Sequence, residues 1–303
     1  MRVLAPGKLV LTGAYAVLDG APAIVAAVDR YAVADSSRVS QSPAPEVRAA
    51  FGDAAAPETD VRALHDAEGR KLGLGSSAAA VVAALAAKAL ARGEDLNDAS
   101  VRAGLFLEAR RAHGRVQNGG SGVDVAASVY GGVLKYVVGE FSPAIRRVVW
   151  PADVVLAAYF GGVSARTTEL RARVAALRSG RSRDFAPLAK SMADTARLAA
   201  DALEAGNGSG FVAAARIYGA LLAELGRMAA APIVPPAFAE LASVAEREGA
   251  GFFPSGAGGG DVAVWLGTLG PSAAFAGRAQ ALGLTRLSLS IDRVGVRGEL
   301  LPN

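Results

Sequence analysis

A run of small and hydroxyl-bearing residues between Lys71 and Ala80 has the chemistry to hold a phosphate group. It reads KLGLGSSAAA, so a ligand can approach the backbone closely, and the hydroxyls of Ser76 and Ser77 suit a phosphate oxygen or a metal ion. An Ala/Val/Leu run follows and predicts a helix, whose N-terminal N–H groups attract anions. The run is not a Walker motif, because no Gly-Lys-Ser/Thr follows at the required spacing. Taken alone, it equally suits a plain glycine-rich turn before a core helix.

A carboxylate follows a second glycine-rich bend. Residues 117–127 read QNGGSGVDVAA and place Asp124 at the start of a short apolar helical turn that ends at Gly131-Gly132. An aspartate held at such a bend can point into a cleft, where it orients or deprotonates a nucleophile. Aspartate also commonly caps turns, so both interpretations stay open for this residue alone.

Two further features suit the same chemistry. Residues 254–261 read PSGAGGGD and precede a strand-like run at 262–266. The glycine segment fits a backbone that wraps a phosphate or braces another loop. It also fits a flexible hairpin. Lys8 follows Pro6-Gly7 at the head of an apolar strand. It is either an edge charge or an ammonium that neutralises a transferring phosphoryl group. Together with the glycine segments and Asp124, the second interpretation is favoured.

Composition limits the class of protein. The 303 residues are 52% hydrophobic and 20% charged, enough for a sizeable core in one large or two ordinary domains. The absence of cysteine excludes disulfides, thiol catalysis and cysteine zinc sites, and two histidines are too few for a histidine-rich metal site. A dispersed net charge of +4 argues against nucleic acid and suits a small anionic substrate. Neither a signal segment nor a membrane span is indicated, so we expect a soluble, cytoplasmic protein.

The elements that must position these residues are a mixture of strands and helices, which indicates an α+β fold. A turn at Pro6-Gly7 and a loop or ragged hairpin over 35–60 are expected, and Asn97 or Asp98 and Gly114 are expected to bound one helix. The pattern predicts strands at 3–4, 9–11, 24–28, 31–34, 133–138, 154–159, 262–266, 285–291 and 293–299. It predicts helices at 77–92, 98–113, 165–178, 187–205, 210–229 and 236–248.

Three segments resemble, in order, the signature motifs of the GHMP kinases, the family of galactokinase, homoserine kinase, mevalonate kinase and phosphomevalonate kinase. They are APGKLVLTG at 5–13, GLGSSAA at 73–79 and SGAGGG at 255–260, so the resemblance extends from residue 5 to about 267. Within the family the chain is most similar to the phosphomevalonate kinases. The similarity lies in Lys71 before the second motif, the stretch from Arg111 through His113 and Gln117 to Ala126, Tyr130-Gly131, and Asp261 after the third motif.

The resemblance implies a two-domain GHMP kinase fold, with an α+β nucleotide-binding domain at 1–155 and a ferredoxin-like α/β GHMP kinase domain at 156–303, and an active site between them. It implies ATP and Mg²⁺ as cofactors, with Lys8 and Asp124 facing the reacting phosphoryl group. The implied ATP-binding residues are Gly73, Leu74, Gly75, Ser76, Ser77 and Ala78, with Ser77 also near the metal. The implied substrate-binding residues are Ser121, Gly122, Gly256, Ala257, Gly258 and Gly259.

The chain departs from the family pattern at three places. Ala14 stands where the family usually has Glu, no basic residue lies near Asn118, where phosphomevalonate kinases often carry one, and Glu108 is offset by one residue from the position of a magnesium-binding Glu of mevalonate kinases.

The expected activity is ATP-dependent phosphorylation of 5-phosphomevalonate to 5-diphosphomevalonate, in a monomer or homodimer. The alternatives are a GHMP kinase acting on an alcohol, mevalonate or a sugar, and a non-catalytic nucleotide-binding relative.

Overall fold

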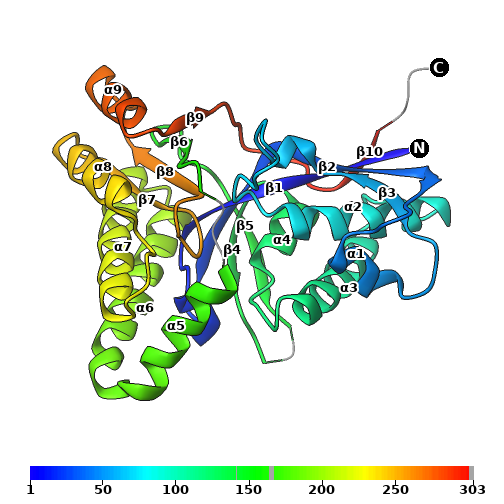
Figure 1. The fold of residues 1–303 in the computed structure, drawn as a ribbon, viewed down its shortest axis with the longest axis horizontal. Coiled ribbons are helices and arrows are strands. Elements are labelled where there is room, and N and C mark those ends of the chain that lie inside the picture. Colours follow the sequence, from blue (N-terminus) through cyan, green and yellow to red (C-terminus); the bar gives the residue numbers. More distant parts are fainter. Residues whose placement is uncertain (141, 164–166, 300–303) are drawn as a thin grey trace. The chain divides into compact units, whose positions relative to one another are not determined.

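The chain forms two compact units that are interleaved along the sequence. The computed structural model describes residues 1–140, 142–163 and 167–299 (Figure 1). Within these residues, the first unit contains 1–8, 25–134 and 290–299, and the second contains 9–24 and 135–289. The predicted domain boundary between residues 155 and 156 stays a prediction, since compactness alone does not define an independently folding domain.

The first sheet has strand order β10-β1-β2-β4-β5, and β3 pairs with β2. Strands β1, β2 and β4 each pass from one unit to the other. The β1–β10 and β2–β3 pairs are antiparallel, with Val3 opposite Gly298 in the first pair. The bounds are β1 (Arg2–Thr12), β2 (Ala23–Val39), β3 (Pro57–Asp60), β4 (Val133–Val137), β5 (Ala144–Val148) and β10 (Arg297–Glu299).

The turn predicted at Pro6-Gly7 is wrong, because β1 continues through both residues. Residue 7 must be glycine, because the backbone of another segment comes too close to leave room for a side chain. A Cβ at Gly7 would lie 2.8 Å from the carbonyl oxygen of Leu74 and 2.8 Å from the side chain of Leu64. The Pro6 carbonyl accepts a 2.7 Å hydrogen bond from the Ser128 hydroxyl. Pro6-Gly7 is therefore the point where the strand meets the loop before helix α2.

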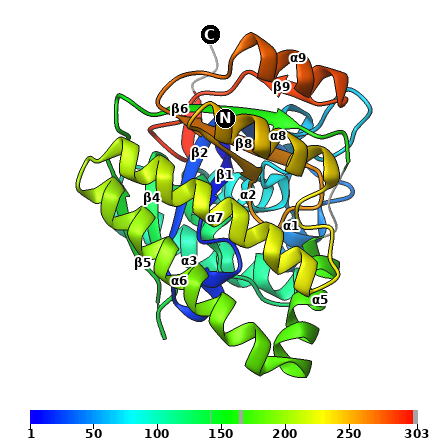
Figure 2. The ribbon, with the colours of Figure 1, turned by 90° about the vertical axis from the view of Figure 1, so that its left-hand side faces the viewer.

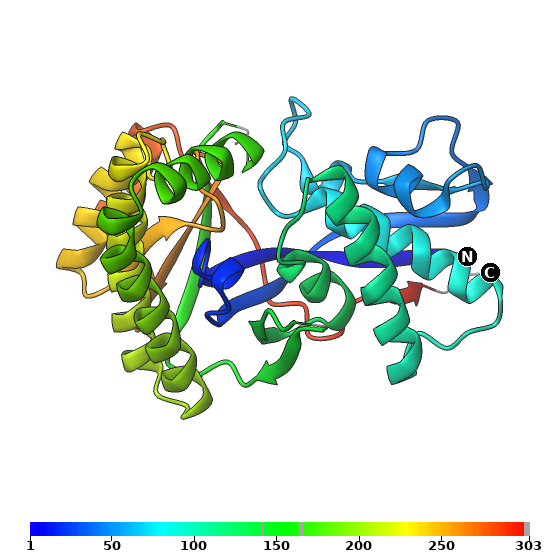
Figure 3. The same cartoon turned by 90° about the horizontal axis from the view of Figure 1, so that it is seen from below.

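The helices of the first unit are α1 (Pro45–Phe51), α2 (Ser76–Ala91), α3 (Ala99–Val116) and α4 (Val123–Tyr130). The side chains of α2 are almost all buried, and α2 lies beside α3, as Figure 3 shows from below. The predicted helix at 77–92 is confirmed. The predicted N-cap Asp98 is also confirmed, since its carboxylate accepts from the Ser100 and Val101 N–H groups. Gly114 does not end α3. Of the loop or ragged hairpin predicted over 35–60, the hairpin alternative is the observed one, since the end of β2 pairs antiparallel and irregularly with β3, with α1 between them.

The second unit contains an antiparallel sheet of order β7-β8-β6-β9 and a group of helices. Helices α6 and α7 lie side by side in Figure 2, and α7 and α8 contact β7. The sequence missed β7 and α9, and placed the start of α6 at Pro187, five residues late. The bounds are β6 (Val155–Phe160), β7 (Gly251–Pro254), β8 (Val262–Gly267), β9 (Thr285–Leu287), α5 (Thr167–Gly180), α6 (Ser182–Glu204), α7 (Gly208–Met228), α8 (Pro236–Arg247) and α9 (Ala273–Ala281). Short 3-10 helices lie at Ala16–Asp19 in this unit and at Arg62–Leu64 in the first. No helix in the described ranges is long and apolar enough to cross a membrane.

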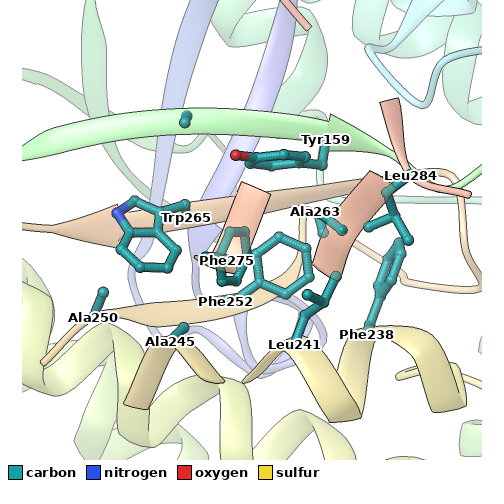
Figure 4. Packing of buried hydrophobic residues seen from close by; sticks show 12 residues of the cluster. Tyr159, Phe238, Leu241, Ala245, Ala250, Phe252, Ala263, Trp265, Phe275 and Leu284 are labelled. Carbon is teal, nitrogen blue, oxygen red and sulfur yellow. The ribbon is translucent and has the colours of Figure 1, made fainter. Parts of the chain in front are cut away.

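An aromatic cluster fills the core of the second unit (Figure 4). Phe275 of α9 packs edge-on against Trp265 of β8, with ring centroids 4.5 Å apart, and against Phe252 of β7 at 5.2 Å. Tyr159 of β6 and Phe238 of α8 complete the contacts. Because these rings join β6, β7 and β8 to α8 and α9, they hold in place the two strands that flank the third glycine segment.

A buried carboxylate fixes the end of the described chain to the first unit. Asp292 is 6% exposed and accepts hydrogen bonds from the Tyr31 hydroxyl at 2.8 Å, the Gly295 N–H at 2.7 Å and the Arg297 guanidinium at 2.8 Å. Burial alone would raise the pKa of Asp292, but these donors and the positive charge of Arg297 outweigh it and hold the pKa below its ordinary value. The charged form of Asp292 therefore stabilises the folded state.

We expect Asp292→Asn to lower the free energy of unfolding at pH 7 by about 3 kcal/mol, because it breaks a largely buried ion pair. The folded pKa lies below the unfolded one, so the contribution is complete above the unfolded value near 4 and is lost as the pH falls through the folded pKa. Urea unfolding at pH 7 and pH 3 should show a smaller difference between variant and wild type in acid. An equal difference at both pH values would contradict this account.

Candidate active site

The glycine-rich loop at residues 73–75 leads into an uncapped helix. Gly75 is the N-cap residue of α2 in the left-handed conformation, with φ 78° and ψ 36°, and no side chain of the described residues caps the helix. The first N–H groups of a helix have no partner within it. Helix α3, in contrast, begins with a capping carboxylate. The start of α2 is therefore able to bind an anion through its backbone, as the sequence predicted for phosphate.

Lys8 lies directly on this loop. Its backbone N–H donates to the carbonyl of Leu74 at 2.9 Å, and its ammonium donates to the carbonyl of Gly73 at 2.8 Å. The side chain is half-buried, which excludes the alternative of an exposed edge charge. Lys8 thus places a positive charge beside the start of α2.

Gly75 packs between the two residues that were predicted to be catalytic. A Cβ added to Gly75 would lie 3.0 Å from Cγ of Lys8 and 3.8 Å from Cβ of Asp124. The fold therefore brings together three segments that are far apart in the sequence. A side chain at position 75 would intrude on this group, so close approach as well as its positive φ requires glycine.

Asp124 is the second residue of α4, whose N-cap is Gly122. Its Oδ1 accepts from the N–H of Val125 at 2.9 Å, and its Oδ2 lies 3.5 Å from Nε2 of His113 on α3. One oxygen of Asp124 therefore bonds a backbone N–H of this turn, as the capping alternative expects, while the other faces another side chain. The sequence analysis named His113 only as a point of family similarity and gave it no role, because its position beside Asp124 arises from the packing of α3 against α4.

The hydroxyl predicted to bind magnesium lies in the first turn of α2. Ser77 is half-buried there, next to the buried Ser76. The residues that the structure describes contain no group of three or more His, Cys, Asp or Glu side chains able to hold a metal. The Ser77 hydroxyl at the start of α2 is a group that could contact Mg²⁺, which usually takes one or two protein ligands and completes its shell with phosphate and water.

Glu108 lies in a different environment from the predicted site residues. Its carboxylate is 3.9 Å from the ammonium of Lys88, and both residues line a cavity of about 270 Å³ between α2 and α3. Arg92 and Glu94 also line this cavity. The geometry gives Glu108 an ionic partner on α2, at the wall of this cavity.

The third glycine segment forms the connection of the β7–β8 hairpin in the second unit. The hydroxyl of Ser255 accepts from the Val10 N–H at 2.8 Å, and the Tyr15 hydroxyl donates to the carbonyl of Ala257 at 2.7 Å. The Gly259 N–H donates to the carbonyl of Ile233 at 3.1 Å. The segment is therefore a hairpin connection, as one alternative predicted, but it is bonded to the end of the first motif.

Tyr15 adopts an unusual backbone conformation to make this contact. Its φ of 66° is positive, which is uncommon and costly for a bulky residue and is found preferentially at functional sites. Burial raises the pKa of its hydroxyl, and the charge of Arg171 opposes that shift. The preceding Ala14 is buried, and its carbonyl accepts from the Tyr218 hydroxyl at 2.7 Å. Nothing in the sequence pattern pointed to Tyr15.

We expect Tyr15→Phe to lower the free energy of unfolding by about 1–2 kcal/mol, because it leaves the Ala257 carbonyl without its donor. The matched control is Tyr159→Phe, since the Tyr159 hydroxyl is buried and has no hydrogen-bond partner among the described residues. Removing that hydroxyl should leave stability unchanged or raise it slightly. Urea unfolding of both variants measures the difference, and equal effects would show that the Tyr15–Ala257 bond does not stabilise the loop.

Comparison with known proteins confirms the resemblance that the three motifs indicated. Residues 54–132 match the family model of the GHMP kinases N terminal domain. The chain is 28% identical to a phosphomevalonate kinase from Streptomyces sp. (strain CL190), in a match that covers 86% of this chain and 88% of the relative.

Solved structures share the fold along nearly the whole chain. The Lin0012 protein from Listeria innocua superposes with a TM-score of 0.83 at 22% identity, covering 98% of this chain and 99% of that one. A phosphomevalonate kinase from Streptococcus pneumoniae, in complex with phosphomevalonate and AMPPNP, superposes with a TM-score of 0.78 at 20% identity, covering 96% and 99%. Mevalonate, homoserine and galactose kinases have the same fold. The predicted GHMP kinase fold and its α+β class are therefore confirmed, and the fold alone does not select an acceptor.

Proposed function

We propose that this chain, which has the GHMP kinase fold and a GHMP kinase N-terminal domain, transfers a phosphoryl group from ATP to 5-phosphomevalonate. The observation that carries the proposal is the grouping of Lys8, Gly75 and Asp124 at the uncapped start of α2. A cation, free backbone N–H groups and a carboxylate at one place are the parts that phosphoryl transfer needs for positioning and charge neutralisation.

The choice of acceptor is supported by likeness along the chain. The Streptomyces relative is a phosphomevalonate kinase, and the pneumococcal structure is a complex with phosphomevalonate and AMPPNP. The product would be 5-diphosphomevalonate, with ADP as the second product. Ser121, Gly122, Gly256, Ala257, Gly258 and Gly259 stay predicted acceptor contacts.

In the proposed site, Gly73 through Ala78 hold the phosphates of ATP. The N–H groups at the start of α2 donate to the phosphate oxygens, and the Ser77 hydroxyl is available to the Mg²⁺ that accompanies the nucleotide. That ion, when bound, neutralises charge on the phosphates. Lys8 adds a fixed positive charge at the same end of the helix.

The transfer breaks the bond between the γ-phosphorus and the oxygen that bridges it to the β-phosphate. It forms a new bond between the γ-phosphorus and an oxygen of the acceptor phosphate, and the bridging oxygen leaves with ADP. A phosphate monoester has its second pKa near 6 and is mostly a dianion at pH 7, so no proton must be removed before attack. Asp124 then orients groups and balances the charge of Lys8 instead of acting as a base.

We expect the wild-type protein to phosphorylate 5-phosphomevalonate in preference to mevalonate or galactose. Asp124→Asn should reduce kcat with 5-phosphomevalonate on the order of 10²-fold, which is the range for one positioned group. The pH–rate profile should rise with a pKa near 6 that belongs to the acceptor and persists in the variant. ADP release in a coupled assay across pH 5–9 measures both.

An alcohol acceptor would give a different pattern, because its hydroxyl has a pKa far above 7 and benefits from a base. If the wild type prefers mevalonate or a sugar and the variant is inactive on it, the acceptor assignment is wrong. If no acceptor in the panel is phosphorylated although ATP binds, the chain is a nucleotide-binding relative without this activity.

Lys8→Met keeps most of the side-chain stem and removes the charge. If Lys8 neutralises the transferring group, kcat should fall at least tenfold while the affinity for ATP changes much less. Lys190→Met is the control, since Lys190 is exposed on α6 and pairs with Asp194 at the surface. Steady-state kinetics and nucleotide titration separate the two effects. Wild-type kinetics in Lys8→Met would remove Lys8 from the reaction.

A further inference from the structure

Arg110 of α3 lies against the loop that begins helix α4. A Cβ added to Gly122 would lie 2.9 Å from Cγ, 3.0 Å from Cδ and 3.2 Å from Nε of Arg110. The arginine stem therefore covers the backbone of Gly122, next to Ser121 and two residues before Asp124. Arg110 as a whole is half-buried, and its stem and Nε are the atoms that lie over the loop.

The position of Arg110 is set by the same helix face that holds His113. The two residues are three apart on α3, which places them on neighbouring turns of one face. His113 faces Asp124 at 3.5 Å, and Arg110 faces Gly122. One face of α3 thus contacts the start of α4 at two successive points, with the guanidinium at the loop and the imidazole at the carboxylate.

The guanidinium of Arg110 has no acidic ion-pair partner in the described part of the chain. No carboxylate there lies within ion-pair distance of it, whereas many arginines of this chain are paired, such as Arg70, Arg278 and Arg297. Helix α4 begins with a glycine in the left-handed conformation, and its first N–H groups bond nearby side chains, Val123 N–H to the Ser121 hydroxyl at 3.4 Å and Val125 N–H to the Asp124 carboxylate at 2.9 Å. A half-buried cation without a counter-charge is unfavourable unless an anion joins it.

We propose that Arg110 binds the phosphate group of the acceptor and so selects a phosphorylated substrate over an alcohol. This inference rests on the proposed function and adds to it the residue that determines acceptor specificity. The planar guanidinium presents two parallel N–H donors that match a phosphate in a bidentate manner. Asp124, two residues beyond Gly122, then lies next to the bound acceptor.

The test uses Arg110→Gln, which keeps a polar stem, and Arg110→Lys, which keeps the charge without the planar fork. Arg111→Gln is the matched control, because Arg111 is the neighbouring residue of the same type and is exposed. We expect Arg110→Gln to raise KM for 5-phosphomevalonate on the order of 10–100-fold, the effect of losing one charge-assisted hydrogen-bonding group. KM for ATP should change less than threefold, and Arg110→Lys should be intermediate.

Each outcome separates the inference from the proposed function. If the wild type does not phosphorylate 5-phosphomevalonate, the proposed function fails and the acceptor role of Arg110 fails with it. If the wild type does so and Arg110→Gln leaves KM for the acceptor unchanged, the inference alone is overturned. It is also overturned if KM for ATP rises equally or if Arg111→Gln has the same effect. Circular dichroism verifies folding, and should Arg110→Gln unfold, an unchanged acceptor KM in Arg110→Lys overturns the inference.

Discussion

The candidate site of the first unit depends on the close approach of strand β1 to the loop before α2. The backbone N–H of Lys8 bonds the carbonyl of Leu74, and the ammonium bonds the carbonyl of Gly73. The approach is possible only because residue 7 has no side chain, since a Cβ there would meet the Leu74 carbonyl oxygen at 2.8 Å. One strand residue thus fixes the loop through its backbone and supplies the cation through its side chain.

Helix α3 has a second organising role in the same unit. Its face toward α4 places His113 near Asp124 and Arg110 over Gly122. Its other end is held by Arg102, which donates to the carbonyls of Leu96 and Val129. Because α3 is anchored at both ends, the residues that face α4 are held by a rigid element, which is what precise positioning of a reacting group requires.

In the second unit, packing and hydrogen bonds likewise hold the glycine-rich segment in place. The aromatic core around Phe275 fixes β7 and β8, and the Tyr15 and Ser255 hydroxyls tie the connection between them to the end of the first motif. The strain of a positive φ at Tyr15 is offset by the surrounding contacts, including the bond from Tyr218 to the Ala14 carbonyl. In both units, therefore, residues of the first motif, or in the case of Tyr15 a residue just after it, bond a glycine-rich segment.

The sequence by itself determined the class of fold, the long elements and the family resemblance. Helix α2 and the N-cap Asp98 were predictable because apolar runs and capping residues act over one or two turns. The loop conformation of the glycine segments was predictable, because few residues other than glycine tolerate a backbone with positive φ. The tertiary structure decided what these segments contact. Pro6-Gly7 resembled a turn locally, but the packing of another loop keeps it in a strand. Arg110 and Tyr15 carried no local signal, and His113 was only a point of family similarity, because their roles arise from contacts with residues distant in the sequence or on another element, which spacing along one chain does not encode.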